Sequence, residues 1–405
     1  MDANAQAPRK LTVRQAAFIG VGAMVGAGIF SLLGAAGEVA GAAVWLSFLI
    51  AGAIALLQGY SFAKFGARYP SAAGLLEYVV RGLGNGHVTG IIAWLILAAN
   101  AIVTGMVAVS FGSYASAALT DGSTVWIKVF AVLLVLAMTL LNIVGSQAVA
   151  RTQTVIVYVV LTILTLFAVT TLANLDLGLL SFSGYPPLRD IVSSVALTFF
   201  AFLGFGVVTF TAKDLTNPSR QLPRAIYLAL GIATTIYVAV ALGVFGTLTV
   251  DKVIESGGTA LAVAAEPTLG RAGYWLMSVT ALFSTAGATN AGLYPAAGLL
   301  ITAAAAIVLA AGFDLSSIAS LGSAIALLVF TLITAAHFRV RAETGASTLV
   351  LSIAITSTVV VLLTFAFTTL VDEPAAAVAL VVILLLSVAL DVGWKRARRG
   401  RVPSR

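Results

Sequence analysis

The sequence predicts an all-α polytopic membrane protein with about twelve transmembrane helices. Of its 405 residues, 60% are hydrophobic and only 9% are charged, and the mean hydropathy is +1.08. A domain that exposes its surface to water needs far more charge than this. Each bilayer crossing takes about 20 apolar residues in a helix, since unpaired amides are not tolerated in hydrocarbon.

The apolar runs give the expected crossings in chain order. They are 12–36, 41–64, 88–118, 125–145, 151–174, 189–212, 223–248, 272–294, 297–313, 318–338, 347–371 and 375–394. The amphipathic segment 69–86 is expected to form a short helix at the cytoplasmic face. The stretch 272–313 carries no charge and is too long for one crossing. We therefore expect two antiparallel helices joined at Tyr294, Pro295 and Ala296, because a proline commonly ends a helix.

Charge predicts the orientation. With both termini in the cytoplasm, every lysine and arginine lies in an inner segment except Lys128, Arg189, Lys252 and Arg271. This is the bias expected for cytoplasmic loops, so we expect a multi-pass protein of the cell membrane, the plasma or inner membrane. The basic tail 395–405 faces anionic lipid, which makes membrane lipid an expected partner. No nucleic acid is expected.

Several classes of protein are disfavoured by what the chain lacks. It has no cysteine and only two histidines, His87 and His337, which we expect to be solvated or capping residues at helix ends. No metal site, no cofactor and no catalytic residue is therefore expected, and no GxxxxGK phosphate loop is present. An enzyme is the least favoured class, since no nucleophile or acid/base pair lies at membrane depth.

Glycine marks the candidate binding site. The first span contains GVGAMVGAGIF (20–30), and the sixth contains Gly204 and Gly206 in FFAFLGFGVVTF. Each glycine weakens a helix by about 1 kcal/mol relative to alanine. A helix broken at mid-membrane offers amides to an anionic group and carbonyls to a cationic group. A zwitterionic amino acid carries both groups.

Close helix packing is the alternative explanation for such glycines. Two glycine-rich spans favour the broken-helix reading, because five helices separate their starts and they run in opposite directions. A repeat of five helices is necessarily inverted, and inverted repeats with paired broken helices are an architecture of transporters.

Four segments carry a resemblance to a known family. They are GVGAMVGAGIF (20–30), GARYPSAAGLLEYVVRGLG (66–84), FFAFLGFGVVTFTAKDLTNPSRQLPRAI (199–226) and ALFSTAGATNAGLYPA (281–296). Together they resemble an amino acid permease of the amino acid, polyamine and organocation (APC) superfamily. The resemblance implies a five-plus-five inverted repeat with two additional helices, and secondary transport by alternating access. The implied parts are a tail 1–11, repeats 12–174 and 189–338 around an outer loop 175–188, two helices in 339–394, and the tail 395–405.

The resemblance also implies a substrate site. Amides of Val25, Gly26, Ala27, Gly28 and Ile29 would bind the substrate carboxylate, and carbonyls of Val21, Gly22 and Ala23 its ammonium group. Carbonyls near Phe199, Phe200 and Phe202, beside Gly204 and Gly206, would share the ammonium group. Phe200 matches an aromatic gate, with a core or lipid-facing ring as the alternative. Asn100 matches a pocket position, with a helix-to-helix hydrogen bond as the alternative.

An ion site is implied by more distant resemblance. Ser284 and Thr285, with a carbonyl near Ala23, match a sodium site, although hydroxyls bonded back to their own helix explain them better. Relatives carry acids at the positions of Lys64, Leu203, Gly206 and Lys213, and a lysine at that of Val160. A coupling proton or sodium ion therefore stays open. The chain also lacks a polar loop near Pro295, which could impair activity.

The sequence thus predicts a permease for an amino acid or related amine. A pocket without acidic residues favours small or aliphatic neutral amino acids. The alternatives are an exchanger without ion coupling and a non-transporting membrane sensor or scaffold derived from the same fold. Substrate identity, transport direction and oligomeric state are not predicted.

Overall fold

A computed structural model describes residues 10–71, 73–144, 147–293 and 298–399. The expected turn at Tyr294, Pro295 and Ala296, most of the N-terminal tail and the last residues of the basic tail lie outside this part of the chain. The described residues form helices, together with one isolated parallel bridge between Leu11 and Leu215.

The helices follow one another with short connections. In chain order they are α1 Val13–Ala27, α2 Leu33–Ala40, η1 Gly41–Ala43, α3 Val44–Arg68, α4 Leu75–Leu83, α5 His87–Leu119, α6 Thr124–Val144, α7 Gln147–Ala173, η2 Phe182–Gly184, α8 Leu188–Phe200, η3 Leu203–Asp214, α9 Pro218–Phe245, α10 Val250–Ser256, η4 Gly257–Thr259, α11 Ala260–Leu293, α12 Leu299–Gly312, α13 Leu315–Thr344, α14 Thr348–Asp372 and α15 Pro374–Arg399.

Nine helical segments of the described chain are long and apolar enough to cross a membrane. They are 33–68, 87–119, 124–143, 155–173, 188–214, 218–245, 315–344, 348–369 and 374–396. Two further apolar helices, α1 and α12, are shorter. The eighth expected crossing falls within α11, which is bent at Gly270, where φ is +67°. The chain is therefore a polytopic α-helical membrane protein, while the number twelve stays a prediction.

The expected short helix between the second and third crossings is confirmed as α4. Two glycines with positive φ bound it, Gly74 at +53° and Gly84 at +72°. A side chain is strained in this backbone region, so glycine allows both sharp turns. The helix then packs on α13, where a Cβ on Gly82 would lie 2.6 Å from the Ala336 carbonyl oxygen.

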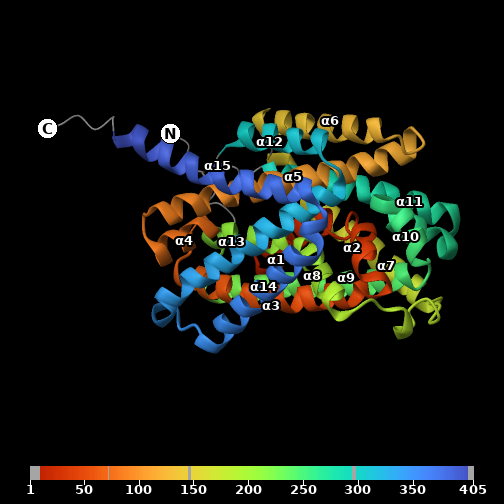
Figure 1. The fold of residues 1–405 in the computed structure, drawn as a ribbon, viewed down its shortest axis with the longest axis horizontal. Coiled ribbons are helices and arrows are strands. Elements are labelled where there is room, and N and C mark those ends of the chain that lie inside the picture. The colour runs from red at the N-terminus through yellow and green to blue at the C-terminus, as the bar shows by residue number, and fades with distance from the viewer. Residues whose placement is uncertain (1–9, 72, 145–146, 294–297, 400–405) are drawn as a thin grey trace, which may run out of the picture.

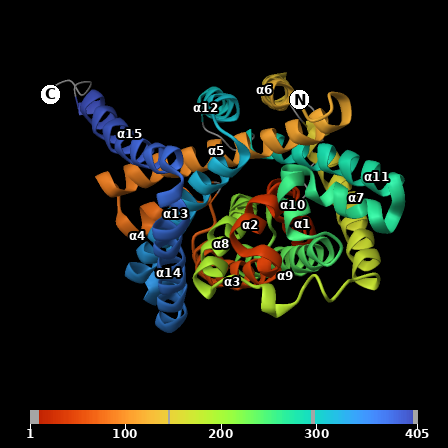
Figure 2. The same cartoon turned by 45° about the vertical axis from the view of Figure 1, so that its right-hand side comes forward.

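The other helices are arranged on the two sides of α5, which runs the length of the molecule in Figures 1 and 2. The helices α6, α12 and α15 lie along its outer side, while α1, α2, α8 and α9 gather on the other side (Figure 2). Most of the buried apolar side chains belong to one continuous core. The two glycine-rich segments lie inside that core, so their surroundings are protein and not lipid.

The two histidines lie in different surroundings, and the expectation for His337 is wrong. Its residue is fully buried. The reason is that α13 extends to Thr344, beyond the expected end of the crossing at residue 338, so His337 lies within the helix and against α3. His87 is at a helix end as expected, with 60% of its side chain exposed and its Nδ1 2.5 Å from Asp391 Oδ2.

Candidate functional site

The first glycine-rich helix is interrupted between α1 and α2. A capping box between Thr12 and Gln15 begins α1, and the helix ends at Ala27. The Gly28 carbonyl then accepts hydrogen bonds from the amides of Ser31, at 3.3 Å, and Leu32, at 3.1 Å. Because this turn is not a continuous α-helix, the last carbonyls of α1 and the first amides of α2 lack partners within their own helices.

The break lies about one turn later than the resemblance implies. Gly22 and Gly26 are inside α1, and the Gly28 amide still donates to the Met24 carbonyl at 3.2 Å. In an α-helix each amide binds the carbonyl four residues earlier, so the amides of 25–27 pair with the carbonyls of 21–23. Most of the groups expected to hold a substrate therefore bind each other here. Of the expected amides, those of Gly28 and Ile29 lie beyond α1, and the Gly28 amide is bound to Met24.

The sixth crossing changes from an α-helix to a tighter helix. Hydrogen bonds join the Phe202 amide to the Phe199 carbonyl, at 2.9 Å, and the Phe205 amide to the Phe202 carbonyl, at 3.0 Å. The twelve-residue 3-10 helix η3 follows. Runs of this kind are seldom longer than three or four residues, and inside a helix they often mark a hinge. The sequence predicts an interruption of the helix near Gly204. The structure has one, since α8 ends at Phe200, but the chain continues as a 3-10 helix.

The two interruptions touch each other. A Cβ on Gly28 would lie 2.1 Å from Ala201 Cβ, and one on Gly204 would lie 2.4 Å from the Met24 amide nitrogen. Contacts this short exclude any larger residue, so both glycines serve close backbone packing. Gly26 packs in the same way on α11, where its Cβ would lie 2.2 Å from Ala288 Cβ. In this arrangement the space between the breaks is closed.

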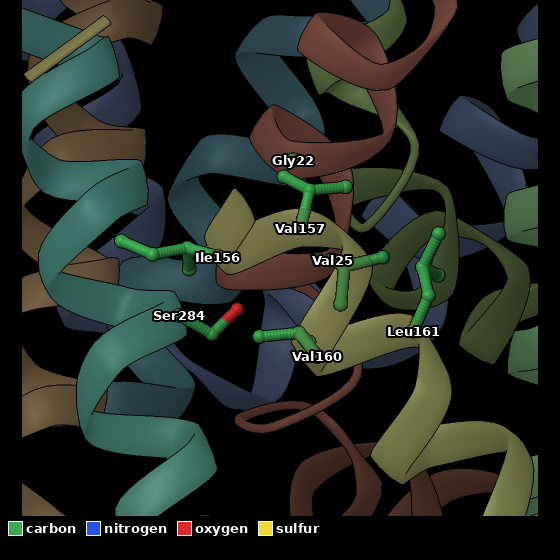
Figure 3. Close-up of a pocket in the computed structure, with 7 residues that line it drawn as sticks. All are labelled: Gly22, Val25, Ile156, Val157, Val160, Leu161 and Ser284. Atoms are coloured by element: carbon green, nitrogen blue, oxygen red, sulfur yellow. The ribbon is translucent and has the colours of Figure 1, made fainter. Parts of the chain in front are cut away.

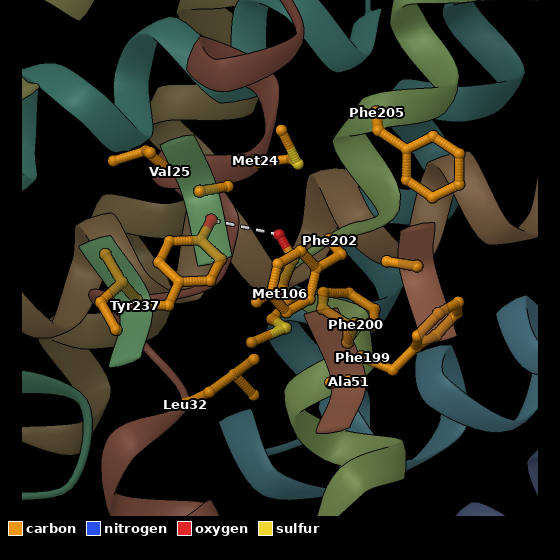
Figure 4. Close-up of a cluster of buried hydrophobic side chains, with 14 of the residues drawn as sticks. Met24, Val25, Leu32, Ala51, Met106, Phe199, Phe200, Phe202, Phe205 and Tyr237 are labelled. Atoms are coloured by element: carbon orange, nitrogen blue, oxygen red, sulfur yellow. Dashed lines mark hydrogen bonds between the residues drawn. The ribbon is translucent and has the colours of Figure 1, made fainter. Parts of the chain in front are cut away.

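Two buried tyrosines hold the carbonyls at the breaks. Tyr114 of α5 donates to the Phe30 carbonyl at 3.2 Å, and Tyr237 of α9 donates to the Ala201 carbonyl, also at 3.2 Å. The close-up in Figure 4 shows the Tyr237 bond beside the ring of Phe202, whose centroid lies 5.1 Å from that of Tyr237. The tyrosines therefore satisfy carbonyls that a break would leave unpaired.

The expected aromatic residues surround the same point (Figure 4). Phe199, Phe200 and Phe202 are all buried, which excludes a lipid-facing position for Phe200. The Phe200 ring covers Gly322 of α13, since a Cβ there would lie 2.2 Å from Phe200 Cε2. Gly206 is less crowded, with the nearest atom to a Cβ, on Leu75, at 3.4 Å.

Asn100 is joined to a neighbouring helix. Its Nδ2 donates to the Gly292 carbonyl of α11 at 2.7 Å. Asn100 therefore forms the helix-to-helix hydrogen bond that was expected as the alternative to a position in the pocket. The hydrogen bond leaves the side-chain carbonyl of Asn100 available to another donor.

The two expected ion ligands differ in their surroundings. Thr285 donates back to the Ala281 carbonyl at 2.6 Å, as the alternative reading held. The Ser284 hydroxyl faces a small cavity of about 10 Å³ between α1, α7 and α11 (Figure 3). The other lining residues are Gly22, Val25, Ile156, Val157, Val160 and Leu161. This volume suits one water molecule, and the lining side chains apart from Ser284 are apolar.

One polar group at the break was not predicted from the sequence. The Ser31 hydroxyl lies in the turn between α1 and α2, is buried, and makes no hydrogen bond among the described residues. Its position directly after GAGIF was the available signal. A buried hydroxyl without a partner costs free energy, so one that lies at a break is a candidate ligand contact.

A larger hollow of about 680 Å³ lies away from the breaks. It is open and is lined by residues of the loop after α7, among them Leu177 and Phe182, together with Trp45 and Leu242. Trp45 Nε1 donates to the Tyr185 hydroxyl at 2.8 Å beside it. The hollow therefore belongs to the loop expected on the outer side.

A polytopic helical protein with two interrupted crossings in contact at its centre has the form of a membrane transporter. The family model described as Amino acid permease matches residues 15–317. The chain therefore belongs to the amino acid permease family of the APC superfamily, as its glycine-rich motifs predict, and it is a transporter and not an enzyme.

Three relatives illustrate the range of the family. The chain is 31% identical to the Inner membrane transport protein YbaT of Escherichia coli over 93% of its own length and 94% of that protein. It is 30% identical to the vacuolar Cationic amino acid transporter 4 of Arabidopsis thaliana, over 60% of its length and 44% of that protein. It is 26% identical to the Branched-chain amino acid permease BcaP of Bacillus subtilis, over 58% of its length and 54% of that protein.

Proposed function

We propose that the protein carries neutral amino acids, small or aliphatic, across the cell membrane by alternating access, with both termini in the cytoplasm and a five-plus-five inverted repeat. The observation that supports this most strongly is the contact between the two interrupted crossings at Gly28 and Ala201. When this contact opens, the last carbonyls of α1 and the first amides of α2, which lack partners within their own helices, would suit the two charged groups of an amino acid.

The buried charges favour a neutral side chain on the substrate. Apart from tyrosines, the fully or nearly fully buried ionisable side chains of the described residues are His337 and Asp391. Neither contacts a break, because His337 bonds to Ser61 and Asp391 to His87 and Lys395. A cationic side chain would therefore be desolvated without a counter-ion. The names of the relatives differ on this point, since one refers to cationic and another to branched-chain amino acids.

The closed contact defines the transport step that must occur. A substrate enters only when the interrupted crossings move away from the helices they pack against, where Gly26 meets α11 and Phe200 meets Gly322 of α13, because no side chain fits there now. We propose that α1, α2, α3, α8, η3 and α9 rock together against the remaining helices. The Leu11 amide donates to the Asp214 carbonyl at 2.7 Å, so the start of α1 and the end of η3 are already joined.

Exchange without a coupling ion at the Ser284 cavity is the mode that this structure favours. The cavity presents Val160, at the position where the family resemblance implies a lysine, and one hydroxyl supplies too few oxygen ligands for a cation. Counterflow should therefore proceed at its normal rate without a sodium gradient. A rate that rises severalfold when external sodium is added would contradict this mode.

Uptake by proteoliposomes tests the substrate class. Purified protein is reconstituted and given radiolabelled leucine, alanine, arginine or putrescine. We expect leucine or alanine to exchange and arginine and putrescine to fail as competitors. Preferred transport of arginine or putrescine would refute the neutral-substrate proposal, and ligand binding without any flux would identify a sensor.

A further inference from the structure

His337 is an ionisable side chain buried inside a membrane crossing, and the transport proposal does not use it. Its ring lies in the contact between α13 and α3, stacked on Phe65 at a centroid distance of 4.1 Å. Nδ1 lies 2.8 Å from Ser61 Oγ of α3, and Nε2 lies 2.8 Å from Thr344 Oγ1 of its own helix. Ionisable residues at this depth are expensive, and they commonly mark proton or ion pathways.

The hydrogen bonds assign the position of the ring proton. The Thr344 hydroxyl donates to the Arg341 carbonyl at 3.2 Å, which leaves its oxygen to accept from the ring. We therefore assign the ring hydrogen to Nε2, so that Nδ1 accepts the proton of the Ser61 hydroxyl. That hydroxyl makes no other hydrogen bond among the described residues. Nδ1 is thus the one ring atom at which a further proton can bind.

The surrounding charges oppose a second proton in this arrangement. From α3, Lys64 follows Ser61 by three residues, with its Nζ 5.8 Å from the Tyr60 ring centroid. Glu343 precedes Thr344 but accepts a hydrogen bond from Tyr69 at the end of α3.

Near His337, neutralising charge is also lacking on the other helices packed against α13. The Glu373 carboxylate does contact α13, but at Ser320, in the other half of the helix. On α4, Glu77 is paired with Arg81 at 2.8 Å. On α15, Asp391 is paired with His87 of α5 and with Lys395. The part of α14 described as a crossing, 348–369, contains no titratable residue. A protonated ring would therefore be a buried charge without a carboxylate partner, beside a lysine.

We propose that Nδ1 of His337 is a proton-binding site reached from the cytoplasm, and that proton binding separates α3 from α13 and opens the substrate site inward. The proton would convert Nδ1 from acceptor to donor, so the Ser61 hydroxyl must turn and accept from the ring. The charged ring, which has no carboxylate partner, would gain from hydration when α3 and α13 separate. This proposal rests on the proposed function, because α3 belongs to the group of helices that rocks and α13 does not.

The polar residues beside His337 explain why the contact between Ser61 and His337 is the one that responds to pH. Gln58 of α3 donates to the Ala354 carbonyl of α14 at 3.2 Å and accepts from Thr334 of α13. One turn below, Ser61 makes the contact to His337, and Thr344 is only partly buried. The groups that Gln58 contacts cannot bind a proton, whereas the imidazole of His337 can. His337 also lies nearer to the ends of α3 and α13. Opening therefore begins at the cytoplasmic side.

Counterflow at equal pH on both sides of the membrane tests the site without any proton gradient. Wild-type protein, His337→Asn and His87→Asn are compared in proteoliposomes loaded with leucine. An asparagine keeps an acceptor near the position of Nδ1 but cannot titrate. We expect the wild-type exchange rate to change about threefold or more between pH 5.5 and 8, because the hydrated ring of the opened arrangement would titrate in the ordinary range of histidine. The rate of His337→Asn should stay flat.

His87→Asn is the matched control, because His87 also bonds through Nδ1 but is exposed. It should keep the wild-type pH profile. A His337→Asn protein that retains the wild-type profile overturns the proposal. If wild-type protein exchanges no neutral amino acid at any pH, the proposed function fails, and the proton site is then tested separately.

The separate measurement is nuclear magnetic resonance of the His87→Asn protein labelled with ¹⁵N-histidine, in which His337 is the one histidine left. We expect the Nε2-protonated tautomer at high pH and proton binding at Nδ1 on acidification. A ring that stays neutral from pH 8 to 5, or one that is charged throughout, refutes the proton site whatever the transport result.

Discussion

Ser31 combines two properties that point to a ligand contact. It lies at a break in a helix, and its hydroxyl is buried without a partner. A hydroxyl in this position lowers stability until something binds to it. A bound amino acid would bring hydrogen-bond donors and acceptors to this point, so Ser31 is the side chain that we expect to gain most from substrate.

Ser31→Ala tests this expectation. Because the hydroxyl makes no hydrogen bond with the described residues, the melting temperature should stay the same or rise slightly. The KM for exchange should increase by about tenfold, since a hydrogen bond to a charged group contributes about 1.5–3 kcal/mol. Thr302→Val in α12 is the control, because it also removes a buried, unpartnered hydroxyl and should leave KM unchanged. An unchanged KM for Ser31→Ala would remove Ser31 from the site.

Tyr237→Phe tests the support of the second break. The ring contacts with Phe48 and Phe202 remain, but the Ala201 carbonyl loses its donor. We expect a loss of about 1–2 kcal/mol in stability, seen as a lower melting temperature in detergent, and a lower exchange rate. Tyr158→Phe, at a half-exposed position, should change neither. Equal melting temperatures for the two variants would contradict a supporting role for Tyr237.

At the scale of elements, the sequence predicted where the helices are disturbed but not how. Glycine content identified the first and sixth crossings because glycine lowers helix stability whatever its neighbours. The position of the first break was predicted a turn too early, since Gly22 and Gly26 pack within α1 and the chain departs from it at Gly28. The change of the sixth crossing to η3 occurs where Gly204 packs against Ala23 and Met24, which are far away in the sequence.

Gly204→Ala tests the contact between α1 and η3. Its Cβ would lie 2.4 Å from the Met24 amide nitrogen and 2.8 Å from the Ala23 carbonyl oxygen, and backbone atoms cannot rotate away. We expect a loss of about 1–3 kcal/mol in stability and at least a tenfold slower exchange. Gly231→Ala is the matched control, because nothing lies within 4 Å of its Cβ and alanine favours the helix. Full activity of Gly204→Ala would show that the contact is not needed.

For the whole molecule, composition was enough to predict a polytopic helical protein, because hydrocarbon permits few alternatives. The polar contacts between crossings were not predictable. His337 was expected at a helix end, and its pairing with Ser61 joins residues 276 positions apart. Asn100 and Gly292 are joined in the same way across 192 positions. No local pattern encodes such pairs, although they decide which helices are tied together and which can move.

Rocking of one group of helices against the other is tested by cross-links, which this cysteine-free chain permits. Ser193 Oγ of α8 lies 2.7 Å from Thr369 Oγ1 of α14, across the two groups, so cysteines at both positions should form a disulfide. Thr331 Oγ1 and Thr358 Oγ1, at 2.8 Å, both lie in the stationary group and give the matched control. We expect oxidation to stop exchange in Ser193→Cys/Thr369→Cys and a reductant to restore it, while Thr331→Cys/Thr358→Cys stays active. Full exchange by protein shown by gel mobility to be cross-linked between α8 and α14 would mean that these helices do not move apart during transport.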